Sequence, residues 1–235
     1  MSRCQSLIAE DAGDAIGTLL VLAIGDGTPH VTWAQVARLE IIPFVSETVT
    51  DQEFLVGRED GTPVTVAGEL RLPRSGNERF PLVILLHGSG GIGGFVTDWE
   101  EQFLAMGVAT FVIDSFTGRG IVSTINDQSQ AGRLVQMEDA YRALALLEKH
   151  PRIDSGRVML MGLSRGGQSA LYASMTRFQR MHAAGSAAHF AAYVAFYPDC
   201  SATYRDEQDI SASPVRIFVS EDRLPPIQEL KKSSG

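Results

Sequence analysis

Apolar residues along this chain follow two patterns that alternate from about residue 64 onward. Continuous apolar runs that end at glycines or polar turns are typical of strands buried on both faces of a parallel sheet. Five such runs occur: PLVILL, ATFVID, RVMLMG, FAAYVAF and PVRIFV. Between them, DWEEQFLAMG and QMEDAYRALALLEKHP carry apolar residues at helical spacing. This alternation predicts an α/β fold, a mostly parallel sheet with helices on both faces and right-handed crossovers.

The first third of the chain is less regular. The stretch PVTVAGELRLP alternates between β-branched and other residues, which predicts a strand in an antiparallel edge pair. VTWAQVARLEIIPF favours a short helix that runs into a strand. Residues 15–25, AIGTLLVLAIG, have the length of a signal-peptide core, but acidic residues precede them and no small-x-small cleavage site follows closely. We expect an unassigned extension over residues 1–50, with 15–25 as a short buried strand or helix, and one α/β domain over residues 51–235.

Composition narrows the functional classes. The chain has 235 residues, 44% of them hydrophobic, and a net charge of -8, which disfavours nucleic acid and anionic membrane surfaces as partners. No apolar run has the roughly 20 residues that a membrane span needs. The two cysteines, Cys4 and Cys200, have no metal-ligand spacing, and we expect two free thiols, with a single bridge as the alternative. We expect no metal and no cofactor, while the oligomeric state and the compartment (cytoplasmic by default, periplasmic or secreted as alternatives) stay open.

One motif carries candidate chemistry. Gly162, Ser164 and Gly166 fit G-x-S-x-G, and the motif follows the strand RVMLMG and precedes the helical pattern SRGGQSALYASM. A serine on such a tight strand-to-helix turn projects its hydroxyl above the carboxyl end of the sheet. The backbone N–H of Arg165, at the start of the helix, can then stabilise an oxyanion. The alternative is an ordinary turn between a strand and a helix.

A second, independent element follows an earlier strand. The glycine-rich stretch LLHGSGG lies where such folds place the other oxyanion donor, which we expect to be the N–H of Ser89. A phosphate-binding loop is the alternative, but the Lys-Ser/Thr pair of a P-loop does not follow. We expect His87 near this loop, and Phe116 and Arg119 of DSFTGRG as pocket residues, with a plain glycine turn as the alternative for DSFTGRG.

These motifs together resemble the dienelactone hydrolase family within the α/β-hydrolase fold. The stretches that carry the resemblance are PLVILLHGSGG, ATFVIDSFTGRG, HPRIDSGRVMLMGLSRGG and PVRIFVSED, and it extends from about residue 50 to about residue 222. The founding members use a cysteine nucleophile, and Ser164 occupies that position here. The resemblance implies hydrolysis of a small-molecule ester or lactone through an acyl-enzyme, without a cofactor, and makes dienelactone itself a poor substrate candidate.

The rest of the catalytic triad departs from the family pattern. The triad runs in the order serine, acid, histidine. The family has an aspartate shortly before a proline, which assigns the acid to Asp222, with Glu221 and Asp199 as alternatives. A histidine should follow, but residues 223–235 contain none. The histidines of the chain are His30, His87, His150, His182 and His189. Only His87 is expected near Ser164, where it shapes the oxyanion loop.

The C-terminal tail is also unusual in composition. Two of the three lysines, Lys231 and Lys232, lie in the last five residues, while seventeen of the twenty basic residues are arginines. The fold would still require a strand and further helices after Asp222. We therefore expect a chain truncated at its C-terminus. The sequence leaves open a serine ester hydrolase and a catalytically inactive fragment or pseudoenzyme that keeps a small-molecule pocket. A third alternative keeps the fold but changes the chemistry to acyl transfer or peptide hydrolysis.

Overall fold

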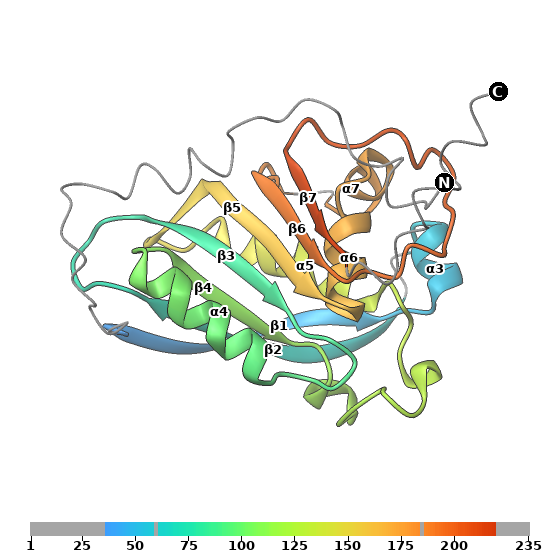
Figure 1. Cartoon of the computed structure of the whole chain (residues 1–235), viewed down its shortest axis with the longest axis horizontal. Coiled ribbons are helices and arrows are strands. Elements are labelled where there is room, and N and C mark those ends of the chain that lie inside the picture. The colour runs from blue at the N-terminus through green and yellow to red at the C-terminus, as the bar shows by residue number, and fades with distance from the viewer. Residues whose placement is uncertain (1–35, 59–60, 184–185, 220–235) are drawn as a thin grey trace, which may run out of the picture.

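The computed structural model describes residues 36–58, 61–183 and 186–219 of the chain. A seven-stranded sheet runs through these residues in the order β1-β2-β4-β3-β5-β6-β7 (Figure 1). The strands are β1 (Arg38–Thr48), β2 (Thr62–Leu72), β3 (Phe80–Leu86), β4 (Ala109–Asp114), β5 (Ile153–Leu163), β6 (Ala192–Phe196) and β7 (Val215–Phe218). β2 pairs antiparallel with β1 and β4, and the remaining pairs are parallel. The predicted α/β class is confirmed.

Helices lie on both faces of the sheet (Figure 1). They are α3 (Asp51–Leu55), α4 (Gly94–Ala105), α5 (Val135–Leu147), α6 (Arg165–Tyr172) and α7 (Thr176–His182). The larger core cluster packs α3, α5, α6 and α7 against one face, and a smaller cluster lies under α4 on the other. Within the described part of the chain, no helix is long and apolar enough to cross a membrane.

The structure differs from the sequence-based expectations at the start of the sheet and at Cys200. β1 pairs along its whole length with β2, so residues from Arg38 onward belong to the sheet, although the pattern alone leaves them in the unassigned extension. Cys200 is disulfide-bonded, which corrects the expectation of free thiols, because cysteine spacing does not show which loops the fold brings together. Cys4, the only other cysteine of the chain, lies outside the described residues.

A buried ionic cluster connects α3, α5 and α7. Glu138 lies 3.0 Å from Nδ1 of His182 and accepts a 2.6 Å hydrogen bond from Nε of Arg142. The other ring nitrogen of His182 lies 2.9 Å from the carbonyl oxygen of Phe54, whose ring stacks on the imidazole. Burial raises the pKa of Glu138, but the hydrogen bonds from His182 and Arg142 outweigh burial and leave the pKa below its ordinary value.

This cluster predicts a loss of stability at low pH. A carboxyl group whose pKa is lowered by folding stabilises the folded state above its unfolded pKa, about 4.3, and loses that contribution as the pH falls through the folded value. We expect Glu138→Gln to lower the free energy of unfolding by about 2 kcal/mol at pH 7 and by less near pH 3. Urea unfolding at both pH values measures this. Equal losses at both pH values would contradict it, and Glu148→Gln serves as the control.

Candidate active site

Ser164 occupies a strained turn between β5 and α6. Its backbone has φ 54° and ψ -110°, a conformation that side-chain-bearing residues rarely adopt. The N–H of Ser164 donates to the carbonyl oxygen of Phe196 at 2.8 Å, and its carbonyl oxygen accepts from the N–H of Gln168 at 2.8 Å. The residue is exposed although its neighbours in α6 are buried. The turn therefore holds the hydroxyl out of the core at the carboxyl end of β5.

The glycines of the motif are required by close backbone approaches. A Cβ atom at Gly162 would overlap the carbonyl oxygen of Gly166, and one at Gly166 would overlap the carbonyl oxygen of Leu86. Both contacts involve backbone atoms, which cannot swing away as a flexible side chain can. The spacing read from the sequence thus corresponds to a turn that only glycine fits at these two positions.

The loop after β3 lies against this turn. A Cβ atom at Gly88 would be 3.6 Å from the Cβ atom of Ser164, so the two backbones are adjacent. The carbonyl oxygen of Ser89 accepts a 2.8 Å hydrogen bond from the N–H of Thr124, which fixes the loop. Arg165 is the first residue of α6, and its N–H has no acceptor within the helix. The structure therefore brings the backbones of Ser89 and Arg165 to the side of Ser164.

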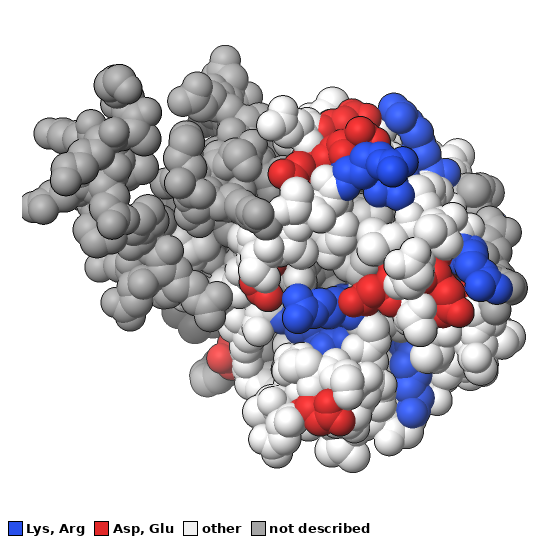
Figure 2. All heavy atoms as spheres, turned by 90° about the vertical axis from the view of Figure 1, so that its right-hand side faces the viewer, with Lys and Arg blue, Asp and Glu red and all other residues white. Residues whose placement is uncertain are grey.

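A cavity of about 260 Å³ opens beside the serine. The residues that line it are Ser89, Gln128, Arg133, Ser164, Arg165, Gln168, Tyr197 and Asp199. The carboxyl ends of the parallel strands meet on the right-hand side of Figure 1, and the view of that side shows acidic and basic side chains interspersed (Figure 2). The site is thus polar and carries charges of both signs.

The side chain of Arg165 is used structurally. Its guanidinium donates to Oε1 of Gln128 at 2.8 Å and to the carbonyl oxygens of Ala131 and Gly132 at 2.6 Å each. The amide of Gln128 in turn donates to Oγ of Ser89 at 3.1 Å. Gln128 therefore connects Arg165, the first residue of α6, to Ser89 in the loop after β3. Among the described residues, no carboxylate pairs with Arg165.

This connection predicts an effect of Gln128 on activity without an effect on folding. Gln128→Ala removes the bridge between Arg165 and Ser89 at an exposed position. We expect kcat/KM for an ester to fall about tenfold, while the free energy of unfolding changes by less than about 1 kcal/mol. Gln130→Ala is the matched control, because its amide donates only to carbonyl oxygens of its own loop. Equal activity of the two variants would show that the bridge does not position the site.

His87 is buried behind the loop that follows β3. It is fully inaccessible to solvent, its Nδ1 lies 2.8 Å from the carbonyl oxygen of Gly88, and its Nε2 accepts from the N–H of Ser115 at 3.3 Å. Burial lowers the pKa of the imidazole. The hydrogen bonds assign the proton to Nδ1, so Nε2 is already occupied by a backbone donor. This arrangement supports the loop and leaves no ring nitrogen free to accept a proton from Ser164.

The two other expected pocket residues do not line the cavity. Phe116 is buried, with its ring edge against the imidazole of His87. The guanidinium of Arg119 forms a buried ion pair with Asp139 and also donates to the carbonyl oxygens of Ser115 and Glu47. Both residues follow β4 at the correct edge of the sheet, but their side chains turn toward the core and toward β1.

Of the three candidate acids, one lies within the described residues and two lie outside them. Asp222 and Glu221 lie outside them. Asp199, in the loop after β6, lines the cavity and lies 3.8 Å from a guanidinium nitrogen of Arg133. Asp199 also accepts a 2.9 Å hydrogen bond from the N–H of Ser201. It is therefore the one carboxylate among the described residues that lines the cavity with Ser164.

The remaining histidines lie elsewhere. His150 precedes β5 and His189 precedes β6, at the amino ends of these strands, and His182 is engaged with Glu138 at the end of α7. None of the histidines in the described ranges lines the cavity, and His30 lies outside those ranges.

Four cavity residues were not foreseen from the sequence, namely Gln128, Arg133, Gln168 and Tyr197. Three of them lie in loops after β4 and β6, and Gln168 faces the cavity from the first turns of α6. The one signal in the sequence for these residues was the position of their segments after strands of the parallel sheet. In open α/β sheets, ligands bind outside the carboxyl ends of the strands, so every loop at that edge is a candidate.

Comparisons with known proteins agree with this architecture. The model of the dienelactone hydrolase family matches residues 67–233. A dienelactone hydrolase-like promiscuous phosphotriesterase, P91 from metagenomic libraries, is 16% identical, with 81% of this chain and 74% of that chain covered and a TM-score of 0.51. A dienelactone hydrolase-type protein from Klebsiella pneumoniae subsp. pneumoniae MGH 78578 is 15% identical, with 83% and 82% covered and a TM-score of 0.51.

At these identities the two solved structures establish the fold alone, and no curated protein matches the chain. The family model, in contrast, spans more than half of the sequence and includes both the loop after β3 and the turn at Ser164. This chain therefore belongs to the dienelactone hydrolase family and has the α/β-hydrolase fold.

Proposed function

We propose that the chain hydrolyses carboxylic esters or lactones of small molecules, with Ser164 as the nucleophile. The observation that carries this proposal is the serine turn itself. Its strained backbone holds an exposed hydroxyl beside the Gly88 backbone, at the mouth of a polar cavity. Strain of this kind persists where the surrounding structure enforces it, which is typical of active sites.

The reaction follows from the positions of the donors. Oγ of Ser164 attacks the ester carbonyl carbon and transfers its proton to a general base, while the N–H groups of Ser89 and Arg165 bind the developing oxyanion. In the family pattern this base is the triad histidine, which has no counterpart among the described residues that line the cavity. The tetrahedral intermediate collapses, the proton is returned to the departing alkoxide, and an acyl-serine remains. Water then attacks the acyl-serine, releases the carboxylic acid and restores the hydroxyl of Ser164.

The acid of the triad is assigned to Asp222, which follows β7 in the chain. Its spacing before Pro226 is the one implied by the resemblance to the family. Asp199 is the alternative, and its place in the lining of the Ser164 cavity supports it. Asp222→Asn and Asp199→Asn, assayed side by side, separate the two, since only the acid that orients the base should reduce kcat strongly.

A second candidate function is a pocket that binds small carbonyl compounds without turnover. The position of the histidines favours it. His87 has both ring nitrogens engaged, and no histidine of the described residues lines the cavity. A serine without a base is a weak nucleophile near neutral pH.

An assay of p-nitrophenyl acetate hydrolysis with the purified chain decides between the ester hydrolase and the non-catalytic binding pocket. Release of many equivalents of p-nitrophenol per chain, above the rate in buffer, is the result expected for the hydrolase. A rate equal to that in buffer, together with saturable binding of the non-hydrolysable p-nitrophenyl ketone analogue, would establish the binding pocket instead.

A further inference from the structure

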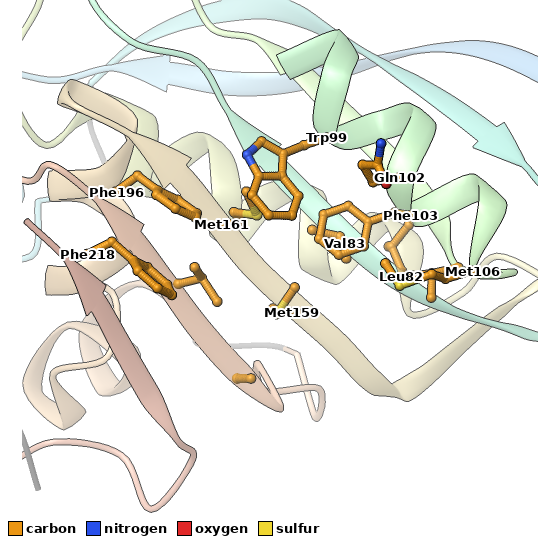
Figure 3. A pocket seen from close by; sticks show the side chains of 13 residues that line it. Leu82, Val83, Trp99, Gln102, Phe103, Met106, Met159, Met161, Phe196 and Phe218 are labelled. Carbon is orange, nitrogen blue, oxygen red and sulfur yellow. The ribbon is translucent and has the colours of Figure 1, made fainter. Parts of the chain in front are cut away.

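An apolar groove runs across the sheet face that carries α4 (Figure 3). Its volume is about 530 Å³, and we call it the α4-face groove. Its lining includes Trp99, Phe103, Met159, Met161, Phe196 and Phe218, and Gln102 is its one polar lining side chain. This groove is separate from the polar cavity at Ser164, since the two share no lining residue.

The groove exists because one face of several parallel strands is left without a helix. Parallel strands are normally covered on both faces. α4 packs on β3 and β4. Within the described ranges, no other helix covers this face of β5, β6 and β7, where Met159, Met161 and Phe196 lie (Figures 1 and 3).

The composition of the undescribed segments distinguishes two candidate occupants from the same chain. Eight of the eleven residues of segment 15–25 are apolar and none is charged. Segment 220–235, which follows β7, has six charged residues and three large apolar ones among its sixteen. An apolar groove is satisfied by apolar surface, and it penalises buried charge. Segment 15–25 is therefore the better match.

The attachment points of the N-terminal segment lie within reach of the groove. Val36 precedes β1 at the same edge of the sheet as Leu82 and Val108, which line the groove. β1 and β3 are three strand spacings apart, about 14 Å. Residues 26–35 can span up to about 33 Å when extended. The length of chain between segment 15–25 and β1 is thus sufficient.

We propose that residues 15–25 pack into the α4-face groove and complete the helical layer on that face of the sheet. As a helix, eleven residues are about 16 Å long, similar to the roughly 14 Å from β3 to β7. The occupant is this chain's own N-terminal segment. A C-terminal tail or a second copy of the chain in the groove would be a different result. The proposal is independent of the proposed esterase activity.

Photo-crosslinking tests the proposal on the full chain. A benzophenone amino acid replaces Met159 at the floor of the groove, and the irradiated monomer is digested with trypsin and analysed by mass spectrometry. No Lys or Arg lies between Arg3 and Arg38, so the expected product joins the peptide of residues 4–38 to the probe. Three results would overturn the proposal: a crosslink to the C-terminal tail, a crosslinked dimer, or crosslinks to residues of the groove lining alone. The matched control places the probe at Val122, which is 88% exposed in the segment after β4 and does not line the groove.

Tryptophan fluorescence gives a second readout. In a Trp33→Phe background, Trp99 is the only tryptophan and reports on the groove. We expect Leu20→Asp to shift the emission of Trp99 to longer wavelength and to increase the binding of an apolar dye. Leu7→Asp, outside segment 15–25, should change neither. Unchanged emission in Leu20→Asp would show that the segment does not cover Trp99.

Discussion

Ser164→Ala is expected to reduce the hydrolysis of p-nitrophenyl acetate by at least about 100-fold, to a rate near that of the buffer. The substitution removes the only atom that can form the acyl-enzyme and leaves the backbone donors of Ser89 and Arg165 in place. In serine proteases with a complete triad, loss of the serine costs on the order of 10⁶ in kcat. We expect a smaller loss of activity for this chain, because no histidine of the described residues lines the cavity.

Ser169→Ala is the matched control for this experiment. Ser169 lies in the same helix, its hydroxyl is fully buried, and that oxygen has no hydrogen-bond partner among the described residues. Its removal should leave both activity and stability close to those of the unmodified chain. Initial rates of the three proteins over a range of ester concentrations give kcat/KM. Equal activity of Ser164→Ala and the unmodified chain would exclude Ser164 as the nucleophile.

The largest expected effect on stability comes from the buried pair of Arg119 and Asp139. The side chains are 3% and 0% exposed. The two terminal guanidinium nitrogens of Arg119 donate to the two carboxylate oxygens of Asp139, at 2.8 and 2.9 Å. Asp139 also accepts a 2.5 Å hydrogen bond from Oγ of Ser46 in β1. Asp139→Ala would leave the buried guanidinium of Arg119 without the carboxylate that balances its charge. We expect a loss of about 3–5 kcal/mol in the free energy of unfolding.

Two comparisons make this prediction specific. Asp154→Ala breaks an exposed pair with Arg157, with side chains 36% and 48% exposed, and should cost less than about 1 kcal/mol. The double variant Arg119→Met with Asp139→Leu removes both buried charges and should recover much of the loss. Urea unfolding gives all of these values. A loss at Asp139 as small as that at Asp154 would show that the buried pair does not connect β1 to α5.

The sequence was sufficient for the parts of the site that are local in the chain. The spacing of Gly162, Ser164 and Gly166 encodes a turn whose geometry needs glycine on both sides of the serine, and the structure has this turn. The apolar runs of β3 to β7 likewise predicted the parallel sheet, because strands buried on both faces need no alternation.

The parts of the site that depend on contacts between residues far apart in the sequence could not be predicted from local patterns. Arg119 follows a strand at the correct edge and was expected in the pocket, yet Asp139, twenty residues later, draws its guanidinium into the core. Gln128 lines the cavity although no local pattern marks it, whereas Asp199, which also lines the cavity, could be named from the sequence as an alternative acid because it follows a predicted strand. The disulfide of Cys200 is also a nonlocal contact.

The most direct test of the central claim is the intact mass of the chain after brief reaction with p-nitrophenyl acetate and acid quenching. Our account predicts a species heavier by one acetyl group, with the modification located at Ser164 by peptide mapping and absent from Ser164→Ala. An acetyl group found only on lysines, or no acetylated species under conditions where p-nitrophenol is released, would contradict an acyl-enzyme at Ser164.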